Sequence, residues 1–137
     1  MKIAVDFDGT IVEHRYPEIG KPVLFAFDAL KELQKRGHKL VLWTYRTGKE
    51  LQDAVDFCKE NGVEFYAVNK SFPEEQCDPS NHNHKIDAEL FIDDRNLGGF
   101  PGWANVLQTL HPEDFAAELQ PKSILEKVRN FIDEIKS

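Results

Sequence analysis

Two aspartates near the N-terminus, Asp6 and Asp8, are the residues of this sequence best suited to chemistry. They end a short apolar run that is typical of a β-strand, and Gly9 and Thr10 follow at once. Because side chains two positions apart in a strand face the same side, both carboxylates can converge where the strand ends. Gly9 lets the backbone turn sharply and approach a bound group. Converging carboxylates beside backbone N–H groups suit a hard divalent cation with an anionic substrate, which is the chemistry of phosphoryl transfer.

Alternating strand-like and helix-like segments supply the framework that must position these carboxylates. The expected strands are residues 3–7, 39–43, 63–68 and 89–92, and the expected helices are residues 23–36, 47–60 and 124–135. Strands that alternate with helices predict a parallel sheet with right-handed crossovers. Near-continuous apolar strands fit burial on both faces of such a sheet. We therefore expect an α/β protein in three layers, with a central, mostly parallel sheet flanked by helices.

Local signals mark where the first two helices begin and end. Thr47-Gly-Lys-Glu50 has the form of a capping box, which predicts a helix start at Thr47. Gly37 and Gly62 follow the two helical patterns and are typical C-terminal stops.

Polar side chains gather at the carboxyl ends of the expected strands. Asp6 and Asp8 end the first strand, Thr44 follows the second, and Asp93 and Asp94 follow the fourth. In open parallel sheets, ligands bind beyond the carboxyl ends of the strands. These residues therefore predict one shared site, and their common placement is stronger evidence than any single motif.

Composition limits the class of protein. The 137 residues suffice for one domain, 1–137, and the net charge of −7 argues against a dedicated nucleic-acid binder. Two cysteines, Cys58 and Cys77, are too few for a disulfide framework and fit a reducing compartment. The sequence contains no signal-peptide pattern and no apolar stretch of the roughly 20 residues needed to span a bilayer. We expect a soluble, cytoplasmic protein without a membrane partner.

Four ordered motifs resemble those of the haloacid dehalogenase (HAD) superfamily of phosphohydrolases. They are residues 6–10, the strand end at residues 42–44, Lys85, and residues 91–94. The resemblance covers roughly residues 1–96 and implies a Rossmann-like, HAD-like fold. Larger members carry a cap domain after the first motif or after the third strand. Here the loops at 11–22 and 69–84 are too short for one, which implies a minimal, capless member.

The resemblance implies a phosphatase that hydrolyses a phosphate monoester. Asp6 would be the nucleophile that forms an aspartyl-phosphate, and Asp8 the general acid for the leaving group and then the base for water. Mg²⁺ would lie between Asp6, the backbone carbonyl of Asp8, and Asp93. Asp94 would lie close to the metal, and which of the last two aspartates touches it directly stays open.

The resemblance also implies a set of phosphate-binding groups. Thr44 would donate its hydroxyl to a phosphoryl oxygen, and Lys85 would neutralise charge on the phosphate and on Asp6. Lys70 is the alternative for the lysine role. Gly9 would bring backbone N–H groups to the phosphate, and Arg46 is a candidate phosphate clamp.

Several other residues have two interpretations. His14, Arg15 and Tyr16 lie in the loop where the superfamily has a mobile flap, and an exposed loop explains them equally well. Arg95 either contacts the substrate or pairs with nearby carboxylates. The remaining possibility, a metal site in the polar loop at 69–85, is disfavoured by its loose ligand spacing. Its candidate ligands are Cys77, His82 and His84.

Two other functions are alternatives to the phosphatase for these residues. The first is a phosphate-binding or regulatory module with little turnover, which would have no need of Asp8 as a proton shuttle. The second is a response-regulator receiver domain, which requires an aspartate at the end of the third strand that this chain lacks. A site without a cap must exclude water by its loops, a second subunit or a large substrate. We expect a small phosphorylated substrate, with a homo-oligomer as one way to close the site.

Overall fold

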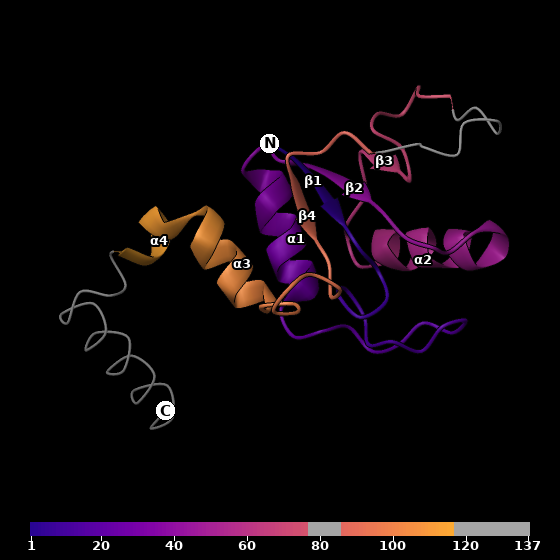
Figure 1. Ribbon diagram of the computed structural model, residues 1–137, viewed down its shortest axis with the longest axis horizontal. Coiled ribbons are helices and arrows are strands. Elements are labelled where there is room, and N and C mark those ends of the chain that lie inside the picture. The colour runs from indigo at the N-terminus through magenta and orange to yellow at the C-terminus, as the bar shows by residue number, and fades with distance from the viewer. Residues whose placement is uncertain (77–85, 117–137) are drawn as a thin grey trace. The chain divides into compact units, whose positions relative to one another are not determined.

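Four parallel strands form the sheet (Figure 1) in the computed structural model, which describes residues 1–76 and 86–116. The strands are β1 (Lys2–Val5), β2 (Lys39–Leu42), β3 (Ala67–Val68) and β4 (Leu90–Ile92), in the order β3-β2-β1-β4. Ala4 of β1 lies opposite Val41 of β2 and Phe91 of β4. Every pairing is parallel, so the carboxyl ends of the strands share one edge, which confirms the expected α/β sheet.

Two helices make the crossovers between the first three strands. They are α1 (Ala26–Lys35) and α2 (Gly48–Glu60). The rings of Phe27 and Phe57 meet edge to face with their centroids 5.8 Å apart, so the two helices pack side by side. Both helices are followed by a glycine with positive φ, Gly37 at 89° and Gly62 at 90°, as their sequence signals predicted.

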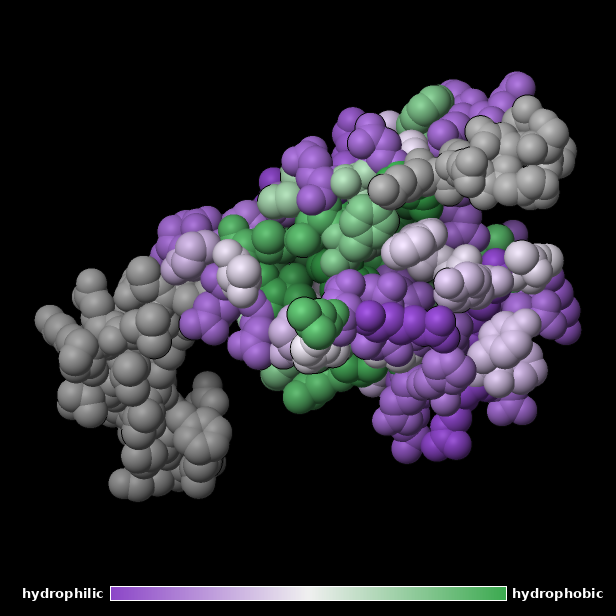
Figure 2. All heavy atoms as spheres, viewed as in Figure 1, coloured by the Kyte–Doolittle hydropathy of each residue, from purple (hydrophilic) through white to green (hydrophobic). Residues whose placement is uncertain are grey.

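The core lies around the two central strands. Their apolar side chains are fully buried: Ile3, Ala4, Val5, Leu40, Val41 and Leu42. Figure 2 shows the hydrophobic residues gathered over the strands and α1. Successive side chains of a strand point to opposite faces, so burial of every one confirms that both faces are covered. In these two strands the accessible polar side chains are the lysines at their first positions, Lys2 and Lys39.

Some local expectations were wrong in extent. β3 is only two residues long, and Val63, the first residue of the expected strand, still completes the end of α2: its N–H donates to the carbonyl of Cys58 at 2.9 Å. Thr47 is the N-cap of α2, but its side chain makes no capping hydrogen bond, so the capping box is not formed. The helix expected at 124–135 lies outside the described residues.

The chain divides into two compact units, Met1–Trp103 and Ala104–Ser137. The first unit contains the whole sheet and ends in the first residue of α3 (Trp103–Leu110). The second contains the rest of α3 and α4 (Pro112–Ala116). The single domain expected from length stays a prediction. Within the described residues, no helix is long and apolar enough to cross a membrane.

Candidate active site

A cavity of about 500 Å³ opens at the carboxyl edge of the sheet. It is lined by residues from four segments of the first unit: Asp6, Asp8, His14, Tyr16, Trp43, Thr44, Tyr45, Arg46, Asp93, Asp94 and Arg95. The strand-end residues that the sequence singled out, Asp6, Asp8, Thr44, Asp93 and Asp94, thus share one cavity. The shared edge of the parallel strands brings them together, as predicted.

Three carboxylates converge in this cavity. Asp6, Asp93 and Asp94 each offer an oxygen, and these atoms lie within 4.8 Å of one another. Burial, reinforced by the negative charges of Asp93 and Asp94, raises the pKa of Asp6 from 3.8 to about 7. Burial and a hydrogen bond with Asp93 also raise the pKa of Asp94. The cluster therefore holds more negative charge than its surroundings stabilise.

This donor set fits a hard divalent cation. Three carboxylate oxygens within reach of one ion are the ligands that Mg²⁺ prefers, and a cation would offset the burial and the repulsion that raise the pKa of Asp6. The side chains of Asp93 and Asp94 both belong to the cluster, so the geometry favours neither as the closer ligand.

Gly9 is needed here to make room for a carboxylate. Its φ is +85°, and a β-carbon at this position would overlap the carboxylate of Asp94. Its own N–H donates to the carbonyl of Val12 at 2.8 Å, so in this structure it is not directed at a ligand. For the Gly9 N–H to contact a phosphate, as expected, its hydrogen bond to the carbonyl of Val12 would have to break.

Asp8 points to a different partner. Its two carboxylate oxygens accept hydrogen bonds from Nε and Nη2 of Arg46, at 2.7 and 2.8 Å. The Arg46 side chain is only 1% exposed and that of Asp8 is 13% exposed. This is the bidentate geometry in which an arginine and a carboxylate bind most strongly. Asp8 is thereby held apart from the three-carboxylate cluster.

Arg46 also fastens the surrounding loops. Nη1 donates to the carbonyls of Pro17 and Glu50, and Nη2 donates to that of Glu18. With the two bonds to Asp8, all five N–H donors of the guanidinium are used. A phosphate clamp, the role expected for Arg46, would need one of these bonds to break. In this structure Arg46 instead ties the loop after β1 and the first turn of α2 to Asp8.

Thr44 keeps a hydroxyl proton for a ligand. Its Oγ1 accepts a hydrogen bond from the N–H of Arg46 at 3.2 Å, and within residues 1–76 and 86–116 its O–H remains free to donate. Its own N–H donates to the side-chain carbonyl of Asn69 at 2.8 Å. Asn69 has a positive φ of 53°, a conformation that asparagine tolerates better than most residues. Thr44 is therefore positioned from two directions.

The other expected residues have different outcomes. His14 and Tyr16 of the loop after β1 line the cavity, whereas Arg15 does not. Arg95 lines it too, and its N–H donates to Asp93 at 3.0 Å. Lys85 lies outside the described residues, as do Cys77, His82 and His84. Lys70 is described and does not line the cavity.

Three lining or supporting residues were missed from the sequence. Trp43 and Tyr45 line the cavity and flank Thr44 along the chain. Their position next to Thr44, a predicted phosphate-binding residue, was the only feature of the sequence that could have indicated them. Asn69 follows β3, so its position at a strand end was a signal of the same kind that marked Thr44.

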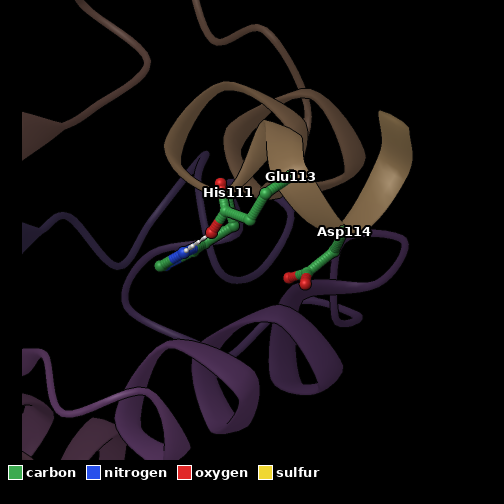
Figure 3. A group of neighbouring side chains, drawn as sticks. All are labelled: His111, Glu113 and Asp114. Atoms are coloured by element: carbon green, nitrogen blue, oxygen red, sulfur yellow. Dashed lines mark hydrogen bonds and ion pairs between the residues drawn. The ribbon is translucent and has the colours of Figure 1, made fainter. Parts of the chain in front are cut away.

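A second group of potential metal ligands lies in the other unit. His111, Glu113 and Asp114 surround the start of α4, and Figure 3 shows the carboxylate of Glu113 directed at the His111 ring. Their separation of 3.2 Å makes them partners of each other. Glu113 and Asp114 are exposed, and exposed groups of this kind are common without a metal. We assign no site to them.

Comparison with solved structures finds clear similarity over most of this chain. The structure of a conserved protein coded by a locus of Bacteroides thetaiotaomicron is 48% identical to this chain, with a TM-score of 0.75. The match covers 88% of this chain and 97% of that one. No protein-family model and no curated protein matches the sequence. At this identity over nearly the whole length, the chain belongs to the same family as the Bacteroides thetaiotaomicron protein.

Proposed function

We propose that this protein is a capless, HAD-like, Mg²⁺-dependent phosphatase that hydrolyses a small phosphate monoester through Asp6. One observation carries the proposal. Asp6, Asp93 and Asp94 converge in a cavity that also contains Thr44 and Asp8, at the edge of a parallel sheet where ligands bind. A nucleophile, cation ligands, a hydroxyl donor and a further carboxylate are the groups that this reaction requires.

Asp6, Asp93 and Asp94 would hold the metal ion. When bound, Mg²⁺ would supply positive charge to the phosphate oxygens and to the ionised carboxylates. It would also keep Asp6 ionised at neutral pH, since its pKa is otherwise about 7. An ionised Asp6 is the form that can act as a nucleophile.

The reaction has two displacements at phosphorus. A carboxylate oxygen of Asp6 attacks the phosphorus atom, the bond to the leaving oxygen breaks, and that oxygen takes a proton. Water then attacks the phosphorus of the aspartyl-phosphate and gives up a proton, which releases phosphate and restores the Asp6 carboxylate. The Thr44 hydroxyl would hold a phosphoryl oxygen through both steps.

Asp8 is the proposed source and acceptor of those protons. To protonate a leaving group, Asp8 must direct a protonated carboxylate oxygen at it, whereas in this structure both of its oxygens accept hydrogen bonds from Arg46. We propose that Asp8 gives up one of these hydrogen bonds during turnover. Since Arg46 also holds Pro17 and Glu18, movement of Asp8 would be coupled to the loop after β1.

The same contact favours a second candidate function. A protein in which Asp8 stays bound to Arg46 would bind phosphate and a cation without transferring protons efficiently. Such a protein would be a phosphate-binding or regulatory module with little turnover. It would bind the same ligands as the phosphatase but hydrolyse phosphate monoesters far more slowly.

Hydrolysis of a panel of small phosphate monoesters, with Mg²⁺ and with EDTA, tests the proposal. We expect Mg²⁺-dependent release of phosphate in the wild type and none above background in Asp6→Asn. Asp53→Asn is a matched control, since Asp53 is an exposed carboxylate on α2 outside the cavity. Phosphate binding in Mg²⁺ without turnover would replace the phosphatase by the binding module.

A comparison of leaving groups tests the role of Asp8. Asp8→Asn should slow the hydrolysis of alkyl phosphates by about 10²–10⁴-fold, since an alkoxide needs a proton to leave. Hydrolysis of p-nitrophenyl phosphate should slow much less, because its leaving group needs no proton. Equal slowing of kcat/KM, which reports the step in which the leaving group departs, would remove Asp8 as the proton donor to that group.

A further inference from the structure

Three aromatic rings stand exposed around the cavity. Tyr45 is 88% exposed, Tyr16 54% and Trp43 40%, and all three line the cavity beside the carboxylates. Among the described residues, only two other aromatic side chains, Phe25 and Phe72, are exposed, and neither lines it. Single exposed aromatic residues need no explanation, but their concentration at one cavity marks a surface for a ligand.

Each ring is held in position by a neighbour. Trp43 meets Phe91 edge to face with ring centroids 5.1 Å apart. The Arg46 guanidinium lies over the Tyr16 ring at 5.1 Å, and the Arg95 guanidinium over the Tyr45 ring at 5.5 Å. Rings that are already positioned lose less conformational freedom when a ligand binds. Together the three rings form one aromatic wall of the cavity, in which Tyr45 is the most exposed.

The rings border the groups proposed to hold the phosphate. Trp43 and Tyr45 flank Thr44 in the chain, and Tyr16 stacks on the arginine that binds Asp8. The cavity of about 500 Å³ is within the range of pockets that hold small organic ligands, and it exceeds what a metal ion and a phosphate group need. Besides the carboxylates and Thr44, the cavity is lined by these three rings together with His14, Arg46 and Arg95.

Resting on the proposed phosphatase function, we infer that the substrate is a phosphate monoester whose leaving group carries a flat, unsaturated ring close to the phosphate. Trp and Tyr rings attract other rings in offset-stacked or edge-to-face geometry, beyond the apolar area that the contact buries. A saturated ring of similar size would occupy the same space without that attraction. Trp43 and Tyr45 are the residues that would determine this specificity.

Hydrolysis of two substrates of nearly equal shape tests the inference. Benzyl phosphate and cyclohexylmethyl phosphate both release a primary alcohol, and they differ in whether the ring is flat and unsaturated. We expect kcat/KM in Mg²⁺ to favour benzyl phosphate by about 3- to 10-fold, the ratio that corresponds to the usual strength of aromatic pairs.

Substitution of the rings should remove this preference. In Trp43→Leu and Tyr45→Leu the ratio should fall toward one, whereas Phe72→Leu, an exposed aromatic residue outside the cavity, should keep the wild-type ratio. Tyr45→Leu is the clearer test, because a side chain that is 88% exposed contributes little to stability and its loss should leave the fold intact. An unchanged ratio in both cavity variants would overturn the assignment of these rings.

Binding of two phosphonates separates this inference from the phosphatase proposal. Benzylphosphonate and cyclohexylmethylphosphonate have a carbon–phosphorus bond that the enzyme cannot hydrolyse, and calorimetry in Mg²⁺ measures their affinities. Tighter binding of benzylphosphonate supports the aromatic wall, even if no monoester is hydrolysed and the phosphatase proposal fails. Equal affinities, with hydrolysis of both monoesters at equal kcat/KM, would overturn the inference and leave the phosphatase proposal standing.

Discussion

Replacing Asp6 by asparagine should stabilise the metal-free protein while it removes the proposed nucleophile. Asp6 lies beside Asp93 and Asp94, and burial together with their charges raises its pKa from 3.8 to about 7. In the unfolded chain, Asp6 ionises without this cost. At pH 8 the wild-type protein therefore folds against an unfavourable charge, and asparagine removes the charge while it keeps the size of the side chain.

The pKa difference sets the magnitude of this effect. One pKa unit corresponds to about 1.4 kcal/mol, so a rise from 3.8 to about 7 gives a ceiling of about 4 kcal/mol. Asp6 is partly exposed, and solvent screening reduces the cost, so we expect about 2 kcal/mol. Between pH 4 and pH 7 the folded state binds more protons at Asp6 than the unfolded state does. Stability from this group therefore falls as the pH rises, and the gap between variant and wild type widens.

Urea unfolding in EDTA at pH 8, 6 and 4.5 measures the gap directly. We expect Asp6→Asn to be more stable than the wild type at pH 8, with the difference shrinking toward pH 4.5. Addition of Mg²⁺ at pH 8 should stabilise the wild type more than the variant, because the variant has lost one proposed ligand.

Asp8→Asn is the matched control, since it makes the same chemical change two residues away. Asp8 is paired with Arg46, so its neutralisation leaves a buried guanidinium without its counter-charge and should destabilise the protein. The two substitutions should therefore have opposite signs at pH 8. If Asp6→Asn were less stable than the wild type in EDTA, or if the gap did not change with pH, the assigned electrostatics would be wrong.

Three further substitutions test individual contacts by urea unfolding. Arg46→Met should cost about 3–5 kcal/mol, since it leaves Asp8 without its partner, and a loss below 1 kcal/mol would contradict the proposed network. Trp103→Phe should cost about 1–3 kcal/mol, because the buried carbonyl of Thr10 loses its hydrogen bond from the indole N–H; equal stability would show that this bond is dispensable. Gly9→Ala should cost more than about 1 kcal/mol through its positive φ and the overlap with a neighbouring carboxylate, whereas the open position Gly37→Ala should show only the conformational cost.

The strand-end carboxylates were predictable because the relevant signals are local. Apolar runs of strand length, helical spacing between them and glycines after the helices indicate a parallel sheet without knowledge of any contact. Parallel strands place their carboxyl ends at one edge, so Asp6, Thr44 and Asp93 had to approach one another. The late start of β3 was not predictable, since Val63, where the expected strand begins, belongs to the turn that ends α2.

The partners of individual side chains were decided by the tertiary structure alone. Asp8 and Arg46 are 38 residues apart, and Arg46 binds loop carbonyls whose positions depend on the path of the chain after β1. The raised pKa of Asp6 depends on how closely other carboxylates approach it. The sequence by itself thus indicated which strand-end residues reach the cavity, because the strands, the helices between them and their parallel arrangement follow from local patterns. The pairing of these side chains, and the position of the aromatic rings at the cavity, depend on distances between loops. No local sequence pattern encodes those distances.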